Sequence, residues 1–221
     1  MSIKYYKKVS EDNLFFTSDT HFFHKNIIQF CQRPFNDIND MQEKLISNWN
    51  NTVPKDGIVF FLGDFAFGNS TEWIKIIKQL NGYIYFILGN HDLQNCNNLK
   101  HLENENSTCL GHLAYLKIIE NSQHLVLTHY PLMTYPKHLW NLCGHTHSSK
   151  INTFNFFKTQ YDVGVDNNNY TPVSFKEIKE KIQLQIKKNE RYNNFNRRKI
   201  WRRIRSFCFR LFKLSYRSKR Y

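Results

Sequence analysis

Short apolar runs recur along most of the chain, and polar stretches separate them. Each run is four to seven residues long and is flanked by Gly, Asn or Asp. That length and those flanks favour β-strands over buried helices. The predicted strands cover residues 14–18, 58–62, 83–88, 113–119, 125–128, 139–143 and 161–165.

Residues that can cap helices lie between several of these runs. Asp40, Ser70 and Ser174 are the candidate N-caps, and Glu43 and Glu177 can complete capping boxes with the first and the third. They predict helices to about residue 50, over residues 71–80, and to about residue 188. Alternation of strands and helices predicts an α/β protein, or a mixed sheet flanked by helices.

The positive charge is concentrated at one end of the chain. The net charge is +13, from 31 Lys and Arg against 18 Asp and Glu. Residues 191–221 contain 12 of the basic residues and no acidic residue, which leaves 31 − 12 = 19 basic against 18 acidic residues in 1–190. We therefore expect a nearly neutral domain over 1–190 and a polycationic tail over 191–221.

The tail has the pattern of a basic amphipathic helix. The apolar residues follow helical spacing, with Arg and Lys side chains around them; they are Ile200, Trp201, Ile204, Phe207, Cys208 and Leu211. Such a helix can lie on an anionic membrane surface. The same residues can bind nucleic acid through phosphate contacts and stacking. A third interpretation is packing on the body or a solvated tail.

Several protein classes are excluded by composition. No apolar run approaches the length of a membrane-spanning helix. The N-terminal segment has no apolar core of the kind found in secretory signals. The five cysteines are odd in number and never spaced as CxxC, so neither a disulfide framework nor a cysteine zinc site is expected. We expect a cytoplasmic protein that can associate peripherally with membranes through its tail.

Five short segments with Asp, Asn or His follow predicted strands. They are Asp19-Thr20-His21, Gly63-Asp64, Gly89-Asn90-His91-Asp92, Thr128-His129 and Gly144-His145-Thr146-His147. In open α/β sheets ligands bind at the strand ends. Residues two apart in an extended backbone point to the same side. We therefore expect each D-x-H or H-x-H pair to offer two ligand atoms to one place.

The ligand atoms in these segments indicate the type of metal. Imidazole nitrogens and carboxylate oxygens without thiolate suit Mn, Fe or Zn. The set is too large for one ion and suits two divalent metals with a bridging carboxylate, a centre that binds phosphate and supports in-line displacement. The candidate ligands are Asp19, His21, Asp64, Asn90, His129, His145 and His147.

In order and spacing, the five segments resemble the signature of the calcineurin-like metallophosphoesterase superfamily. The signature reads D-x-H, G-D, G-N-H-[DE], a lone His and G-H-x-H. The string DTHFFHKNIIQFCQRPF is also similar to small bacterial and phage metallophosphoesterases. Residues 162–166, followed by residues 172–174, resemble their closing strand and final helix. The resemblance covers about 14–185. It implies a two-sheet β-sandwich flanked by helices in four layers.

The resemblance also implies roles for the residues. One metal would be held by Asp19, His21, Asp64 and His147, and the second by Asp64, Asn90, His129 and His145. A hydroxide between the metals would attack phosphorus. His91 would assist the leaving oxygen, with Asp92 as its candidate partner. Residues 63–68 lack the second Asp and the Arg of the protein phosphatase branch, which argues against that activity.

Three residues are candidates for binding the substrate. Asn90, His24 and Arg33 belong to or follow the motifs closely, and the alternative for His24 and Arg33 is a buried polar contact. The expected function is hydrolysis of a phosphomonoester or phosphodiester of a nucleotide or another small molecule. The alternative is a nuclease whose tail holds DNA or RNA. The full set of ligands together with His91 argues against an idle phosphate-binding module.

Overall fold

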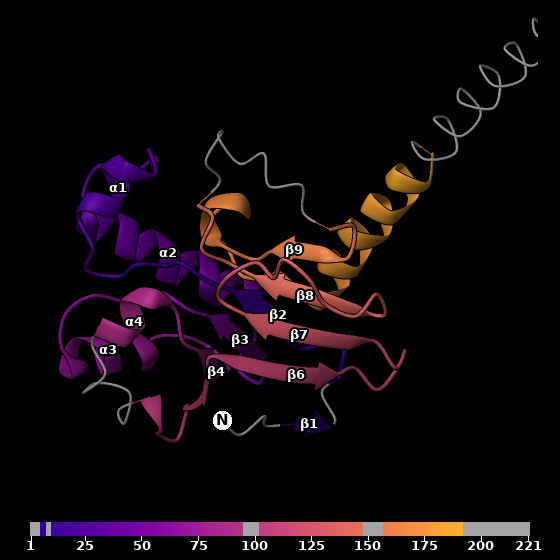
Figure 1. Cartoon of the computed structure of the whole chain (residues 1–221). Helices are drawn as coiled ribbons and strands as arrows, with labels where there is room; N and C mark the ends of the chain where they lie inside the picture. The colour runs from indigo at the N-terminus through magenta and orange to yellow at the C-terminus, as the bar shows by residue number, and fades with distance from the viewer. Residues whose placement is uncertain (1–4, 8–9, 95–101, 148–156, 192–221) are drawn as a thin grey trace, which may run out of the picture. The chain divides into compact units, whose positions relative to one another are not determined.

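The computed structural model describes residues 5–7, 10–94, 102–147 and 157–191. Its strands form two five-stranded sheets, with orders β1-β6-β7-β8-β9 and β10-β2-β3-β4-β5 (Figure 1). The strands are β1 Tyr5–Lys7, β2 Leu14–Thr17, β3 Ile58–Leu62, β4 Tyr83–Ile87, β5 Ser107–Gly111, β6 Leu113–Lys117, β7 His124–Thr128, β8 Leu139–Cys143, β9 Gln160–Asp162 and β10 Val173–Ser174. The helices are α1 Asn26–Phe30, α2 Ile38–Thr52, α3 Ser70–Ile77 and α4 Asn90–Gln94, with a 3-10 turn over Val165–Asn167 and a further helix over 175–191.

Parallel pairing sets the direction in which the motif segments leave the sheets. Strands β2, β3, β4 and β5 run parallel to one another, and so do β7, β8 and β9. The carboxyl ends of parallel neighbours lie at the same edge of a sheet. The segments after β2, β3 and β4 therefore leave at one edge, and those after β7 and β8 leave at one edge of the other sheet.

Alternation along the strands divides the core into two layers. Phe15 and Phe61 belong to the cluster that includes Trp49 of α2 and Trp73 of α3. The next residue along β2, Phe16, points the other way. It stacks on Phe60 at 5.6 Å.

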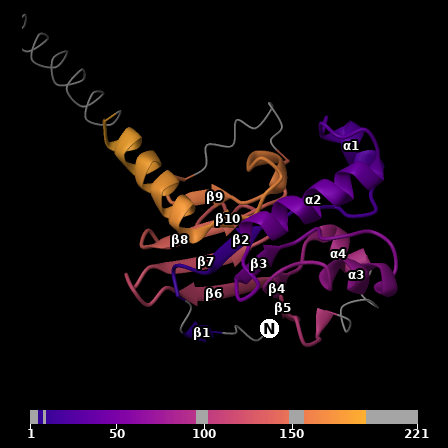
Figure 2. The same ribbon diagram turned by 180° about the vertical axis from the view of Figure 1, so that it is seen from behind.

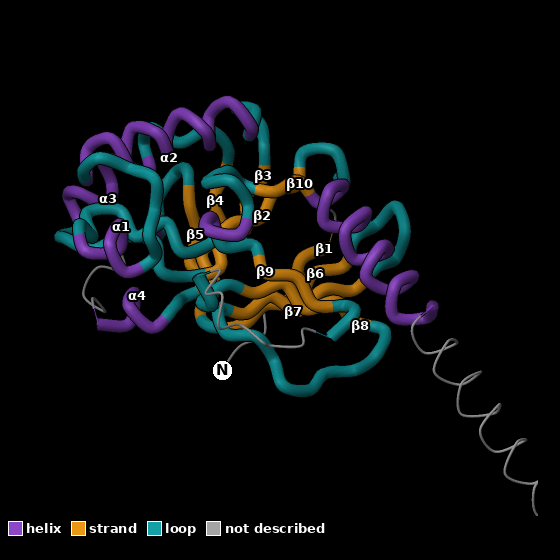
Figure 3. Tube along the Cα trace, turned by 90° about the horizontal axis from the view of Figure 1, so that it is seen from above, coloured by secondary structure: helices purple, strands orange, loops and turns teal. Residues whose placement is uncertain are grey.

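The second layer of the core fills the space between the two sheets. Phe175 connects them, because its ring centroid lies 6.3 Å from that of Phe16 in one sheet and 6.2 Å from that of Trp140 in the other. Figures 2 and 3 show α2 and α3 on one side of the β10-β2-β3-β4-β5 sheet and the second sheet on its other side. Each buried aromatic ring contributes about 2–3 kcal/mol to this sandwich.

The expected α/β sandwich of two mixed sheets with flanking helices is confirmed, and a strand is present at each of the seven predicted positions. Two predicted N-caps were wrong. Asp37 caps α2 through the backbone amides of Asn39 and Asp40, and Asn69 forms a capping box with Glu72 at α3. The capping box of the last predicted helix is present between Ser174 and Glu177.

The pattern of the sequence did not indicate five shorter elements. They are β1, β5, β10, α1 and α4.

The chain divides into two compact units, Met1–Ile182 and Gln183–Tyr221. The expected boundary at residue 190 falls inside the second unit and stays a prediction. Residues 192–221 of the predicted basic tail lie outside the described residues. Among the helices that the structure describes, none is both long enough and apolar enough to cross a bilayer.

Candidate metal centre

The five motif segments meet where the carboxyl ends of β2, β3 and β4 face those of β7 and β8. Backbone bonds join them: Asp19 N–H donates to the Gly63 carbonyl at 2.9 Å, and Gly144 N–H donates to the His129 carbonyl at 2.9 Å. The two sheets are joined at the site itself, since the His145 N–H donates to Asp19 Oδ2 at 2.9 Å. Segments more than a hundred residues apart therefore share one rim.

Five of the expected ligands have left-handed backbones. The φ angles are 59° for Asp19, 52° for His21, 59° for Asp64, 72° for His145 and 44° for His147. A positive φ is costly for residues with a Cβ, about 1–3 kcal/mol each, and such residues cluster at functional sites. The expectation of extended D-x-H and H-x-H pairs was therefore wrong. Tight turns, and not strand alternation, bring these side chains together.

The first group of ligand atoms comes from Asp19, His21 and His147. One atom from each lies within 4.8 Å of the others. The His147 Nε2 is 3.7 Å from Asp19 Oδ1. Asp19 Oδ1 and His21 Nε2 are buried and have no hydrogen-bond partner. Two buried polar atoms left in this way are costly unless a further group binds them.

The second group comes from Asp64, His129 and His145, again within 4.8 Å. The His145 Nδ1 is 3.2 Å from His129 Nε2. Asn90 adds its side-chain oxygen, which lies 3.0 Å from His129 Nε2. These four residues are the ones that the family resemblance assigns to the second metal.

Asp64 belongs to the second group and also faces the first. Its Oδ2 is 3.6 Å from His21 Nε2 of the first group and 3.5 Å from His129 Nε2 of the second. Its Oδ1 accepts the His91 backbone N–H at 2.9 Å. One carboxylate oxygen is thus directed toward imidazoles of both groups, as a bridging ligand requires.

Hydrogen bonds outside the two groups fix the tautomers of two histidines. His129 Nδ1 is 2.8 Å from the Leu62 carbonyl, which can only accept, so Nδ1 carries the proton. His147 Nδ1 is 2.9 Å from Asp166 Oδ2. In both rings Nε2 is the nitrogen that faces the site, and such partners are typical of metal-binding histidines.

The electrostatics of the site favour a cation. Burial opposes the charged form of Asp64, but the hydrogen bond and charge of His129 lower its pKa to about 2. Burial raises the pKa of Asp19 to about 6. Burial also opposes protonation of His129 and His147, yet hydrogen bonds to Asp64 and Asp166 raise their pKa values to about 9 and about 10. In the metal-free protein, the protonated rings of His129 and His147 supply the positive charge beside the carboxylates. A bound metal ion would supply that charge instead.

Arg33 has no donor available for a phosphate. Its Nε and Nη2 bind both oxygens of Asp166 at 2.8 Å each, and its remaining N–H groups donate to the carbonyls of Asp19 and Thr20 and to Met41 sulfur. Only 4% of the residue is exposed. The expected contact between Arg33 and the substrate is therefore wrong. The guanidinium holds the first motif and Asp166 in place.

Asp92 also binds backbone. Its Oδ2 accepts the N–H groups of Asp64 at 2.7 Å and Gly89 at 2.8 Å, and its Oδ1 accepts that of Phe65 at 3.0 Å. These bonds support a positioning role that joins the second and third motifs. The expected partnership of Asp92 with His91 stays a prediction.

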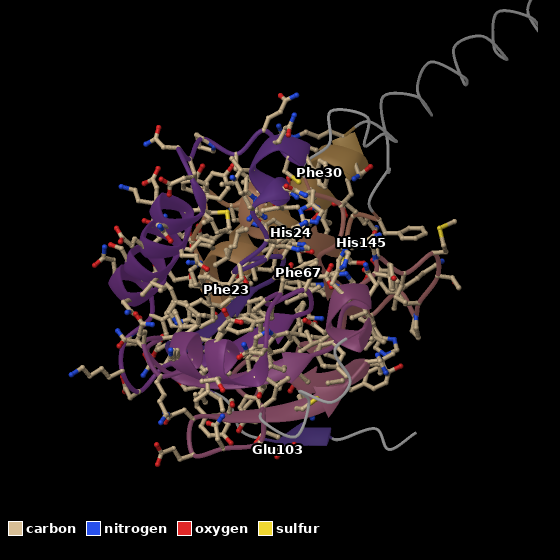
Figure 4. All side chains as sticks on the ribbon, turned by 90° about the vertical axis from the view of Figure 1, so that its left-hand side faces the viewer. Phe23, His24, Phe30, Phe67, Glu103 and His145 are labelled. Carbon is tan, nitrogen blue, oxygen red and sulfur yellow. The ribbon has the colours of Figure 1, made fainter. Side chains whose placement is uncertain are left out.

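His91 and His24 lie at the outer side of the site. The His91 side chain is 33% exposed, and its Nε2 is 4.0 Å from Asp64 Oδ2. His24 Nδ1 is 3.4 Å from His21 Nδ1, and its ring stacks on Phe67 at 4.0 Å (Figure 4). The expected roles of both residues stay predictions.

Sequence reasoning missed two residues of the site. Asp166 was noticed only as part of a closing segment, although it binds both Arg33 and His147. Cys31 forms a further group with His147 and Asp166, each offering an atom within 4.8 Å. Cys31 has no CxxC partner that would mark it as a ligand. No spacing signal could reveal a contact made by residues 116 and 135 positions away from it.

Comparison with known proteins agrees with this geometry. The family model "Calcineurin-like phosphoesterase" matches residues 13–202. An uncharacterized protein of Methanocaldococcus jannaschii is 34% identical over 174 residues, which cover 75% of this chain and 89% of that protein. The Gene 66 protein of Mycobacterium phage L5 is 32% identical over 83 residues, which cover 36% of this chain and 40% of that protein.

A solved structure shows the same fold. The crystal structure of a protein of unknown function from Aquifex aeolicus superposes with a TM-score of 0.60 at 24% identity, covering 76% of this chain and 97% of that one. The match to the family model extends over all five motifs and every strand except β1. This chain belongs to the calcineurin-like phosphoesterase family.

Proposed function

We propose that the protein is a hydrolase of phosphomonoesters or phosphodiesters that works with two divalent metal ions, of which Mn²⁺ is our first choice and Fe or Zn the alternatives. Family membership implies metal-dependent phosphoester hydrolysis. The observation that carries the two-metal proposal is the position of Asp64 Oδ2, within 3.6 Å of an imidazole nitrogen of each ligand group.

The residues present fit such ions. Asp19 Oδ1 and His21 Nε2 are buried without a hydrogen-bond partner. The Nδ1–H groups of His129 and His147 are held outward, so Nε2 is directed inward. Asp19, His21, Asp64 and His147 would hold one ion, and Asp64, Asn90, His129 and His145 the other. When bound, such ions polarise a phosphoryl oxygen and make water nucleophilic near neutral pH.

The protein groups have separable tasks in this proposal. Asp64 fixes the spacing of the two ligand groups, and Asp92 fixes the backbone amide of Asp64. His91 presents a partly exposed imidazole at the edge of the site, where it would donate a proton to the leaving oxygen or stabilise its charge. His24 and Asn90 remain candidates to contact the phosphate.

A substrate screen with purified, Mn²⁺-loaded protein tests the proposal. The panel contains a phosphomonoester, a phosphodiester, 2′,3′- and 3′,5′-cyclic nucleotides and oligonucleotides. We expect metal-dependent turnover of at least one class, and at least about a hundredfold loss in His91→Ala if proton transfer depends on this ring. No turnover with Mn²⁺, Fe²⁺ or Zn²⁺ would contradict the proposal.

The charge of residues 191–221 supports a second candidate, a nuclease or phosphodiesterase acting on DNA or RNA. Twelve basic and no acidic residues in this stretch can bind phosphates. We expect this activity to require the tail and to weaken steeply with salt. If the tail instead binds an anionic membrane, removal of residues 191–221 should abolish sedimentation with anionic liposomes and leave oligonucleotide cleavage unchanged.

A further inference from the structure

Phe30 is exposed next to the candidate metal centre. It is the last residue of α1, and 70% of the residue is open to solvent, although Ile27 in the same helix is buried. A phenylalanine in water forgoes the hydrophobic stabilisation that its burial would give. Its ring centroid lies 6.2 Å from that of His24, edge to face, which directs it to the site side of the helix (Figure 4).

The rings of His24 and Phe67 continue from Phe30 toward the metal-binding side chains. The His24 ring stacks on Phe67 with 4.0 Å between centroids and 27° between planes. Phe67 lies 5.1 Å from His91 and 5.9 Å from His21. An aromatic wall made of Phe30, His24 and Phe67 therefore extends from solvent to the expected leaving-group residue.

A further aromatic residue borders the second ligand group. Tyr130 is 50% exposed, and its ring lies 4.5 Å from that of His145 and 5.1 Å from that of His129. It directly follows His129 in the chain. Aromatic rings therefore border both groups of candidate metal ligands.

We propose that the aromatic wall Phe30–His24–Phe67 is a stacking platform for the base of a nucleotide whose phosphate is bound at the metal centre. This inference rests on the proposed phosphoesterase function and narrows its substrate class. Aromatic side chains bind bases by their faces, and every base has such a face. The enzyme should therefore accept different bases with similar efficiency, because base-edge hydrogen bonds play no part in this recognition.

The geometry favours a base over an acyl chain or a bare sugar. Phe30 ends the wall with 70% of the residue open to solvent, so its ring is accessible to another planar ring. A bare sugar phosphate would gain little from Phe30. The base can belong to a free nucleotide or to a single strand, and the experiment below separates the two.

Paired substrates that differ only in the base give the test. Kinetics of the Mn²⁺-loaded wild type, Phe30→Ala and Phe30→Tyr are measured with AMP and ribose 5-phosphate, and with a single-stranded oligonucleotide and an abasic strand of the same length. We expect Phe30→Ala to raise KM for the base-containing member by about 5- to 100-fold more than for its partner. Phe30→Tyr keeps an aromatic ring, so its KM values should stay close to those of the wild type. The pair that shows the larger difference identifies the free nucleotide or the strand as substrate.

A matched control separates stacking from general surface effects. Phe157 is also an exposed phenylalanine, at 48%, and contacts Tyr135 away from the ligand groups. Phe157→Ala should leave all four KM values unchanged. Equal changes for both members of each pair in Phe30→Ala, or none, would overturn the platform and leave the phosphoesterase proposal standing.

Absence of hydrolysis of every ester would instead overturn the phosphoesterase proposal. The platform is then tested by binding alone, through saturation transfer from protein to the base protons of AMP. A signal present in the wild type and lost in Phe30→Ala would support the platform, and no signal in the wild type would overturn it.

Discussion

Asp166 accepts the Nδ1–H of His147 at 2.9 Å with the same oxygen that Arg33 binds at 2.8 Å. This carboxylate orients a candidate metal ligand without itself belonging to the two main groups. Partners of this kind fix the tautomer and the direction of the ring, and their loss costs about 10- to 100-fold in metal affinity. We expect Asp166→Asn to weaken Mn²⁺ binding by that factor, measured by competition with a metal-sensitive dye. Unchanged affinity would show that His147 is oriented without Asp166.

Arg33 should matter for stability more than for substrate affinity. Arg33→Ala leaves the buried Asp166 carboxylate without its bidentate partner, and breaking a buried pair typically costs about 3–5 kcal/mol. Urea denaturation of the metal-free protein measures this loss. Arg33→Lys keeps the charge but loses the bidentate geometry, so its free energy of unfolding should lie between those of the wild type and Arg33→Ala. A stable Arg33→Ala protein with a raised KM would return Arg33 to the substrate site.

Residue 144 must be glycine because the first motif lies too close to it for a side chain. A Cβ at this position would overlap Ser18 Oγ and Asp19 Oδ2. Because Asp19 is a candidate ligand, Gly144→Ala should lower the metal content of the purified protein, measured by elemental analysis.

Gly111→Ala is the control for this substitution. Its φ is +89° and nothing lies within 4 Å of the added Cβ. The substitution should therefore cost about 1 kcal/mol of backbone strain and leave the metal content unchanged. Equal metal loss in the two variants would contradict a specific role for Gly144.

Metal binding should release protons. The pKa values of about 9 for His129 and about 10 for His147 lie above the ordinary 6.5, so both rings are protonated at pH 7 in the metal-free protein. A metal binds only the neutral ring, so loading at pH 7 should release up to about two protons, and affinity should rise from pH 7 to about 10. Calorimetry in two buffers with different ionisation enthalpies counts these protons. A buffer-independent heat, or affinity that falls with pH, would contradict the assignment.

The sequence predicted the larger elements of the fold because their patterns are local. Phe15 and Phe16 are both buried, on opposite faces of one strand, and the run Ile58–Leu62 was identified with its observed bounds. Strand β10 has two residues and β1 has three, too few for a period to show. The helix α4 begins within the Asn90-His91-Asp92 motif, whose polar residues mask its helical start.

The sequence predicted the ligand residues of the candidate site but not the contacts that hold them in place. Ligand motifs are short and ordered along the chain, so resemblance identified them. The contact of Arg33 with Asp166 spans 133 positions, and the bonds of Asp92 go to backbone amides that any residue could supply. Neither kind of interaction leaves a spacing signal. The left-handed turns at Asp19 and His21 were missed because single residues with a positive φ leave no periodic pattern in the sequence.

The central claim is that Asp64 is shared by two metal ions. Anomalous diffraction at the manganese edge from Mn²⁺-soaked crystals tests it most directly. We predict two peaks about 3.5–4 Å apart, both coordinated by Asp64, and loss of at least one peak in Asp64→Asn crystals. A single peak in the wild type, or two peaks that Asp64 does not contact, would contradict the account.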